Sequence, residues 1–222
     1  MLSIKEKIKF LDFFKNLSQD ELDVLYGISK LSSYPSGYTL YYEEEIKENL
    51  YFLVEGKAKT YKVDRQDNEI FLNYIFANNL ISEISSLDDN EIICLTNTEF
   101  MNDSIVLEIN YRTFKDYFIK TNILTNQFLH EILLKNRQLY CIIDREVVFD
   151  AMAKVAYSLY DDLVMFNSLK RQDVANMLHI QPATLSRILK KLLRQAVIEI
   201  EATTISVLQR DELKKIFSGA SS

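Results

Sequence analysis

A segment near the C-terminus carries polar and basic side chains at helical spacing. In chain order they are Gln181, Thr184, Ser186, Arg187, Lys190, Lys191 and Arg194. Short polar side chains near a helix N-terminus can contact bases or phosphates, and lysine and arginine attract phosphates whatever the base sequence. The apolar residues between them, which would face inward, are Leu185, Ile188, Leu189 and Leu192. The spacing therefore predicts a helix that binds DNA through one face.

The flanking residues predict a helix-turn-helix. Residues 169–178 form a first helix, in which Ala175 is small enough for a second helix to cross closely. Residues 179–181 make the turn, and Pro182 occupies the first turn of the second helix, where a missing N–H does least harm. Two alternating strands, typical of the wing of a winged helix-turn-helix, follow at residues 197–200 and 204–207.

The charge of the chain is divided unevenly. The net charge is −6, from 26 Lys and Arg against 32 Asp and Glu. Residues 1–149 hold 16 of the basic and 24 of the acidic residues, so residues 150–222 hold 10 and 8 and are net positive by 2. Because DNA attracts positive charge, the C-terminal part is the candidate for DNA binding.

The rest of the chain predicts a β-roll and a long helix. Residues 4–31 have the spacing of two short helices, and short apolar stretches from Tyr34 onward, separated by turn residues, favour a compact antiparallel roll or barrel. Helical spacing returns near Tyr111 and continues almost to Asp150. We therefore expect an α+β fold in three parts: the roll with its N-terminal helices at 1–123, a dimerisation helix and hinge at 124–149, and the winged helix-turn-helix at 150–222.

One apolar stripe on the long helix predicts a subunit interface. Its members recur at steps of four or seven residues and are Phe128, Ile132, Leu139, Ile143 and Val147. An isolated helix would leave this stripe in water, so the stripe packs on its own domain or pairs with the same helix of a second subunit. The length of the helix favours a homodimer.

Few residues suit metal chemistry. The two histidines, His130 and His179, are too few for a site of several imidazoles, and their absence from residues 34–110 argues against a metal enzyme of the cupin type. Cys94 and Cys141 form no C-x-x-C pair, so neither a disulfide scaffold nor a thiolate metal site is indicated. Because residues that could serve metal catalysis are few, we expect that the protein is not an enzyme.

No apolar run is long enough to span a membrane and no signal peptide is evident, so we expect a cytoplasmic protein.

The order of these parts resembles a known family. It is similar to the CRP/FNR superfamily, that of the cyclic AMP receptor protein and the fumarate-nitrate reduction regulator, in three stretches: residues 34–56, Phe149–Ala156 and Arg171–Ile198. The resemblance implies a bacterial transcription regulator that binds double-stranded DNA at a palindromic operator as a homodimer. It further implies contact with RNA polymerase if the regulator is an activator, and no membrane partner. The run from Ile180 to Arg187 looks closest to the branch that regulates denitrification in response to nitric oxide.

The resemblance also assigns roles within the recognition helix. It implies that Arg187 makes two parallel hydrogen bonds to a guanine in the major groove. Lys190 and Arg171 would supply attraction to phosphates. Ala183 departs from the family pattern, which often has a glutamate there that accepts from a cytosine, and this departure puts the usual operator sequence in doubt. A helix-turn-helix used only for protein contacts is the alternative, and the basic residues argue against it.

The predicted effector pocket departs further from the family. Cyclic-nucleotide binders in it have a Gly-Glu pair followed by an Arg-Ser pair, which hold the ribose and the phosphate. Here the corresponding pairs are Ser82-Glu83 and Cys94-Leu95, and no Arg or Lys lies between Arg65 and Arg112 to neutralise a phosphate. The resemblance therefore indicates a signal other than cyclic AMP, with a cyclic-AMP-responsive regulator as the weaker alternative.

Other signals stay open. An iron-sulfur cluster needs about four cysteine ligands and the chain has two, which argues against it. Haem can be held by one axial histidine, for which His130 is the candidate, and Cys94 is a candidate redox switch that lacks a basic neighbour. A further alternative is a regulator that is always able to bind DNA because its own apolar side chains fill the pocket. Those side chains would include Ile84, Leu87 and Ile92.

Overall fold

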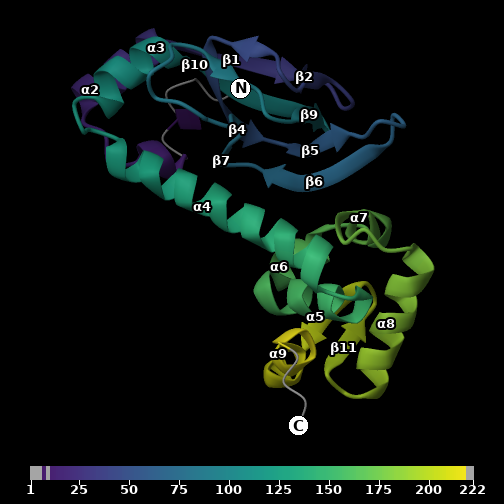
Figure 1. Cartoon of the computed structure of the whole chain (residues 1–222). Coiled ribbons are helices and arrows are strands. Elements are labelled where there is room, and N and C mark those ends of the chain that lie inside the picture. Colours follow the sequence, from purple (N-terminus) through teal and green to yellow (C-terminus); the bar gives the residue numbers. More distant parts are fainter. Residues whose placement is uncertain (1–6, 9–10, 219–222) are drawn as a thin grey trace. The chain divides into compact units, whose positions relative to one another are not determined.

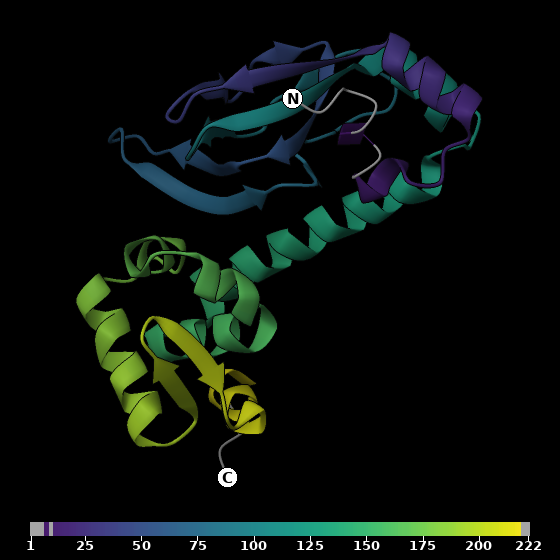
Figure 2. The same cartoon turned by 180° about the vertical axis from the view of Figure 1, so that it is seen from behind.

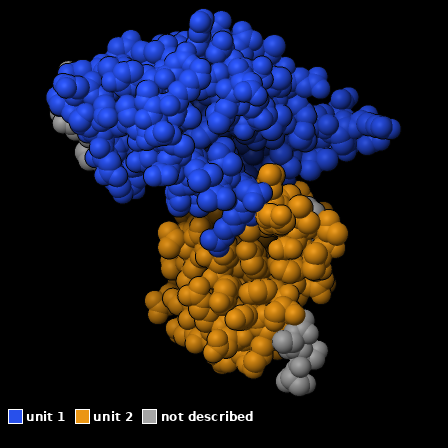
Figure 3. Space-filling model, turned by 60° about the vertical axis from the view of Figure 1, so that its left-hand side comes forward, with its two compact units in different colours: residues 1–137 blue, residues 138–222 orange. Residues whose placement is uncertain are grey.

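The computed structural model describes residues 7–8 and 11–218 and divides the chain into two compact units. These are an N-terminal unit, residues 1–137, and a C-terminal unit, residues 138–222 (Figure 3). The first is rich in strands and the second is mainly helical, so the predicted α+β class is confirmed. The boundary between the units falls inside the long helix, and the expectation that this helix forms a separate part of the chain stays a prediction.

The N-terminal unit is a roll of antiparallel strands (Figures 1 and 2). One four-stranded sheet has the order β1 (Ser29–Tyr34), β10 (Ser104–Asn110), β4 (Asn49–Glu55) and β7 (Asn79–Leu80). A second sheet has the order β2 (Thr39–Tyr41), β9 (Asn97–Phe100), β5 (Lys57–Val63) and β6 (Glu69–Phe76). A short additional pair joins β3 (Ile46–Lys47) to β8 (Ile92–Ile93).

Alternation along β4 explains how the roll is layered. Leu50 and Phe52 pack in a core with the N-terminal helices, whereas Tyr51 and Leu53 belong to a second core inside the roll. Successive side chains of a strand point to opposite faces, so this one strand serves both cores. The second core is filled by buried side chains from both sheets and their loops: Leu40, Tyr41, Tyr51, Leu53, Ala58, Ile75, Ile81, Cys94, Phe100 and Val106.

Short helical elements cover the other face of the first sheet (Figures 1 and 2). They are the 3-10 turn η1 (Asp12–Phe14), α2 (Gln19–Gly27), α3 (Tyr111–Phe114) and a π-helical segment, η2 (Lys115–Ile119). A capping box begins α2, because the Ser18 N–H donates to the Glu21 carboxylate at 2.7 Å and the Ser18 hydroxyl accepts from the Glu21 N–H.

The long helix α4 (Thr125–Ile143) begins later than the sequence periodicity suggested. Asn122 has a φ of +65°, in the left-handed region, so the helical run that starts at Tyr111 ends before α4 starts. A π-helical segment, η3 (Asp144–Val148), follows α4. The Asp150 carboxylate then accepts from the Ala153 N–H at 2.8 Å and caps the first helix beyond the predicted hinge.

Part of the apolar stripe on this helix is used inside the chain. Phe128 is 6% exposed and belongs to the core that the helices share with the first sheet, and Ile132 packs against that core. The prediction that Phe128 faces a second subunit is therefore wrong. Helical spacing of apolar residues marks a buried face, and it does not distinguish a domain core from a subunit interface. Leu139 and Ile143, by contrast, are more than half exposed.

The C-terminal unit contains the predicted winged helix-turn-helix. Its helices are α5 (Ala151–Asp161), α6 (Leu163–Ser168), α7 (Arg171–Met177), α8 (Pro182–Arg194) and α9 (Arg210–Ser218). Its wing pairs β11 (Ile198–Glu201) with β12 (Thr204–Val207). Ala175, the small residue predicted at the helix crossing, is fully buried on α7.

Candidate nucleic-acid interface

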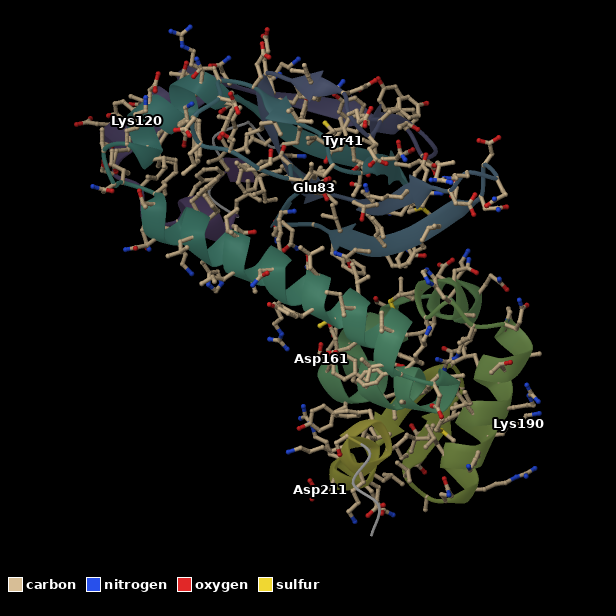
Figure 4. The ribbon with its side chains drawn as sticks, in the orientation of Figure 1. Tyr41, Glu83, Lys120, Asp161, Lys190 and Asp211 are labelled. Carbon is tan, nitrogen blue, oxygen red and sulfur yellow. The ribbon has the colours of Figure 1, made fainter. Side chains whose placement is uncertain are left out.

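Helix α8 separates an apolar face from a basic face. Its apolar side chains, Leu185, Ile188, Leu189 and Leu192, are buried as predicted. The exposed residues of α8 are Ala183, Ser186, Arg187, Lys190, Lys191, Leu193 and Arg194, among which Figure 4 labels Lys190. The buried leucines fix the helix in its unit while the basic face stays open to a partner.

Local backbone geometry sets the ends of α8. Pro182 is its first residue, where the helix requires no N–H donor. At the other end Ala196 has a φ of +53°, and the N–H groups of Ala196 and Val197 donate to carbonyls of the last helical turn at 3.0 Å. This arrangement is a Schellman motif with alanine in the place usually taken by glycine. His179, with a φ of +50°, reverses the chain between α7 and α8.

The basic residues of α8 have no acidic partner in the described part of the chain. Among the described residues, none forms an ion pair with Arg187, Lys190, Lys191 or Arg194, and α8 itself contains no Asp or Glu. Arg187 Nη2 instead donates to Thr184 Oγ1 at 3.1 Å, one turn closer to the helix N-terminus. Four cations that are not neutralised and share one exposed face can bind a polyanion.

Arg171 has a positioning role that sequence spacing did not reveal. Its Nη2 donates to the Thr203 carbonyl at 2.9 Å, and its guanidinium lies 5.5 Å from the ring centre of Phe166. Thr203 is in the turn between β11 and β12, so Arg171 ties the start of α7 to the wing. The phosphate contact expected of Arg171 stays a prediction.

The predicted effector residues lie together on the roll. The Ser82 hydroxyl is buried and accepts from the Tyr51 N–H at 2.9 Å. Glu83 Oε2 accepts from the Leu95 N–H at 3.2 Å and from the Thr96 hydroxyl at 3.1 Å. The structure therefore joins the two predicted pairs of residues through the Glu83 carboxylate, whose position Figure 4 shows together with that of Tyr41.

Cys94 is unsuited to the redox role considered from the sequence. Its side chain is buried, and burial raises the pKa of its thiol to about 12. A thiol with such a pKa stays protonated at neutral pH and is a poor nucleophile. Cys141, in the C-terminal unit, is partly exposed, and its Sγ lies 3.2 Å from the Tyr157 hydroxyl.

Lys135 on α4 is a site residue that sequence reasoning missed. Its Nζ donates to the Ile81 carbonyl at 3.4 Å, immediately before the predicted effector pair. Burial lowers the pKa of Lys135, and the nearby carboxylates of Glu83 and Glu131 oppose that shift. Lysine and carbonyl are 54 residues apart in the chain, so no local pattern could have revealed the contact.

The described residues do not form a haem or metal site around His130. This histidine is exposed on α4, whereas an axial haem ligand has to lie in the pocket that encloses the macrocycle. Among the described residues, no group of three or more His, Cys, Asp and Glu side chains is arranged to hold a metal ion. No helix in the described part of the chain is both long and apolar enough to cross a membrane.

Each of the two units contains a segment that matches a known protein family. Residues 31–121 match the cyclic nucleotide-binding domain, and residues 153–216 match the Crp-like helix-turn-helix domain. The chain has the two domains of a CRP/FNR-type transcription regulator. Within this CRP/FNR-type chain, the first match spans the predicted effector residues and the second spans the basic face of α8.

Relatives extend over nearly the whole regulator. The cyclic AMP receptor protein of Thermus thermophilus is 20% identical over 210 residues, which cover 93% of this chain and 96% of that protein. A solved structure of a CooA mutant from Carboxydothermus hydrogenoformans has a TM-score of 0.73 at 18% identity and covers 92% of this chain and 94% of its own. FixK2 from Bradyrhizobium japonicum has a TM-score of 0.65 at 19% identity, with 87% and 100% covered. At these identities the structures establish the shared fold.

Proposed function

We propose that this CRP/FNR-type regulator is a homodimer that binds a palindromic DNA operator through α8 and responds to a signal other than cyclic AMP. The observation that carries the proposal is the basic face of α8. Its four cations are exposed on one side of one helix and have no acidic partner among the described residues. Phosphates of DNA would supply the missing negative charge.

Arg187 is the residue that we expect to contact a base. Its guanidinium is exposed and already directed along the helix by the hydrogen bond to Thr184. A guanidinium suits the O6 and N7 acceptors of guanine, and Ser186 and Gln181 are exposed nearby for bases or phosphates. Ala183 cannot accept a hydrogen bond from a cytosine, so the operator would differ at that position from one read by glutamate. The likeness of residues 180–187 to the denitrification branch stays a prediction about operator sequence.

The exposed apolar stripe of α4 supports the dimer. Leu129, Leu133, Tyr140 and Ile143 are all more than half exposed, and together with Asn136 they follow one another at alternating steps of four and three residues. This is the heptad spacing of two helices that pair, in which one polar asparagine can fix the register. This stripe differs from the predicted one, because it begins with Leu129 and Leu133 and the predicted one began with Phe128 and Ile132. A two-fold dimer would place two copies of α8 in successive major grooves about 34 Å apart.

The effector site supports a signal other than cyclic AMP. The predicted phosphate position has the buried Cys94 and the apolar Leu95. The nearby Lys47 pairs with Glu45 at 2.8 Å, and Lys135 of α4 donates to the Ile81 carbonyl. The carboxylate that would hold a ribose is already bonded to Leu95 and Thr96. Calorimetry with cyclic AMP should therefore show no micromolar binding, and a saturable micromolar isotherm would contradict this part of the proposal.

Selection from a random duplex library by the purified protein tests the proposal as a whole. We expect enrichment of a palindrome with half-sites centred about 10 base pairs apart. Absence of enrichment would contradict sequence-specific DNA binding, and a single unrepeated half-site would contradict the dimer. We expect contact with RNA polymerase only if the operator lies at a promoter position from which the regulator can activate transcription.

A further inference from the structure

The Glu83 carboxylate occupies a setting that would otherwise suit an external anion. Its Oε2 accepts from one backbone N–H, that of Leu95, and from one hydroxyl, that of Thr96. Both donors belong to the segment that leads into β9, whereas Glu83 follows β7. A backbone N–H together with a side-chain hydroxyl is a common way to hold a bound carboxylate or phosphate. Here the chain places one of its own carboxylates there.

Lys135 supplies the countercharge from α4. Its Nζ donates to the Ile81 carbonyl at 3.4 Å, two residues before Glu83 in the chain. Burial lowers the pKa of Lys135, and the carboxylates of Glu83 and of Glu131, one helical turn away, oppose that shift. The same Ile81 carbonyl accepts from the hydroxyl of Tyr41, which is buried inside the roll. An ammonium group with three N–H donors has bonding capacity beyond this one long hydrogen bond.

The surrounding roll is packed with the protein's own side chains. Tyr41, Ile81 and Cys94 are almost fully buried and belong to one core. Ser82, next to Glu83, uses its hydroxyl to accept from the Tyr51 N–H. The Ser82 hydroxyl is thus committed to the chain, and the Leu95 and Thr96 donors both bond to the Glu83 carboxylate.

We propose that Glu83 is a built-in anionic ligand of the roll, held by the Leu95 N–H and the Thr96 hydroxyl and balanced by Lys135 of α4. The charge interaction links the roll to the long helix with no effector bound. Its regulatory meaning rests on the proposed DNA-binding function, whereas the site itself can be tested without DNA. In functional terms the regulator would carry a permanent substitute for an anionic effector.

Removal of the carboxylate should create a vacancy for a small external carboxylate. The test measures the melting temperature of full-length Glu83→Ala by circular dichroism in sodium acetate and in sodium chloride at equal ionic strength. We expect the variant to melt below the wild type and 0.2 M acetate to raise its melting temperature by about 4 °C over chloride, with saturation. The wild type should show no such difference. A destabilised variant that acetate does not rescue would overturn the proposal.

Two controls separate the site from general effects of acetate. Glu69→Ala removes an exposed carboxylate that pairs with Lys59 on the neighbouring strand, and it should show no rescue. Glu83→Ala combined with Lys135→Met should lose most of the rescue. Equal rescue of Glu69→Ala, or full rescue of the double variant, would overturn the proposal. If Glu83→Ala does not fold, Glu83→Ser leaves similar room and should show the same acetate dependence.

A DNA arm distinguishes this inference from the proposed function. Affinity of Glu83→Ala for the selected palindrome should fall several-fold and recover in acetate. Acetate rescue of folding without any DNA binding by the wild type would refute the DNA-binding function and leave the built-in ligand standing. Selective DNA binding by the wild type without acetate rescue of the variant would do the reverse.

Discussion

The N-terminal unit and helix α8 of the C-terminal unit differ in how their basic residues are paired. In the N-terminal roll and its helices, lysines pair with carboxylates of the same chain: Lys7 with Glu55, Lys30 with Glu108, Lys47 with Glu45, Lys59 with Glu69 and Glu99, Lys62 with Glu43, and Lys120 with Asp116. In α8 of the C-terminal unit, the four basic residues have no such partner among those described. The two surfaces therefore differ in whether their basic side chains have an acidic partner.

The difference teaches how to find a polyanion site in an acidic protein. Exposed ion pairs contribute little to stability, but they cancel the field of a lysine outside the molecule. The overall charge of −6 therefore gives no measure of what α8 can bind. The unpaired, aligned cations identify the surface that requires an external partner, and the paired ones belong to the fold.

The largest expected effect is a loss of stability of the N-terminal unit that leaves the C-terminal unit unchanged. Gly56 has a φ of +107°, and an added Cβ would lie 2.1 Å from Ser104 Oγ and 2.9 Å from the Ser104 Cα. Because backbone cannot move aside cheaply, Gly56→Ala should lower the free energy of unfolding of this unit by about 3 kcal/mol or more. Thermal melting by circular dichroism measures the loss. The control is Gly27→Ala, whose added Cβ meets nothing within 4 Å, and an equal loss in both variants would refute the explanation.

The next effect breaks DNA reading and spares folding. Arg187→Ala should weaken binding to the selected palindrome by roughly 1 to 3 kcal/mol, the cost of losing a bidentate contact to guanine. Its melting temperature should stay close to that of the wild type, because Arg187 is exposed. Gel-shift titration measures the affinity. Lys215→Ala is the matched control, because Lys215 pairs with Glu212 on α9. Unchanged affinity of Arg187→Ala would remove Arg187 from its assigned role.

A substitution on α4 sharpens the comparison by separating assembly from folding. Leu133→Glu places like charges opposite each other along the heptad stripe and should raise the dimer dissociation constant at least about tenfold. The folding of each unit should change little, because Leu133 is more than half exposed. Sedimentation equilibrium measures the constant. Val164→Glu, on the highly exposed Val164 of α6, should leave assembly unchanged, and an equal loss in both variants would contradict the α4 interface.

The smallest effect adds stability to the C-terminal unit. Ala196 holds the left-handed position of the Schellman motif, which costs an alanine about 1 kcal/mol that a glycine does not lose. Ala196→Gly should therefore raise the free energy of unfolding by about 1 kcal/mol. Ala183→Gly, the same change inside the first turn of α8, should lower it by up to about 1 kcal/mol. Chemical denaturation of both variants checks the sign, and a loss in Ala196→Gly would refute the strain argument.

The sequence was most informative where local patterns decide the structure. The amphipathic spacing of α8, Pro182 at its start and the small Ala175 on α7 suffice to predict the helix-turn-helix, because each is a short-range requirement. The alternating stretches likewise predicted antiparallel strands. The order in which the strands pair could not be predicted, because it joins strands far apart in sequence, such as β1 and β10.

The sequence was least informative where distant segments meet. Phe128 has the spacing of an interface residue but packs in its own core, and periodicity cannot choose between those two partners. Lys135 gains its role from the Ile81 carbonyl, and Arg171 gains its role from the Thr203 carbonyl in the wing. These contacts depend on how the chain folds back on itself, so composition and spacing carry no sign of them.

Salt dependence of DNA binding tests the central claim most directly. The equilibrium constant for the selected palindrome is measured from about 50 to 200 mM salt for the wild type and for the Lys190→Ala/Lys191→Ala variant. We predict a linear fall of log K with log salt for the wild type, with a slope of about −4 or steeper, and a slope shallower by about 1 for each phosphate contact that the variant loses. Affinity that does not change with salt, or a slope that is the same in the variant, would contradict the assignment of α8 as the DNA-binding face.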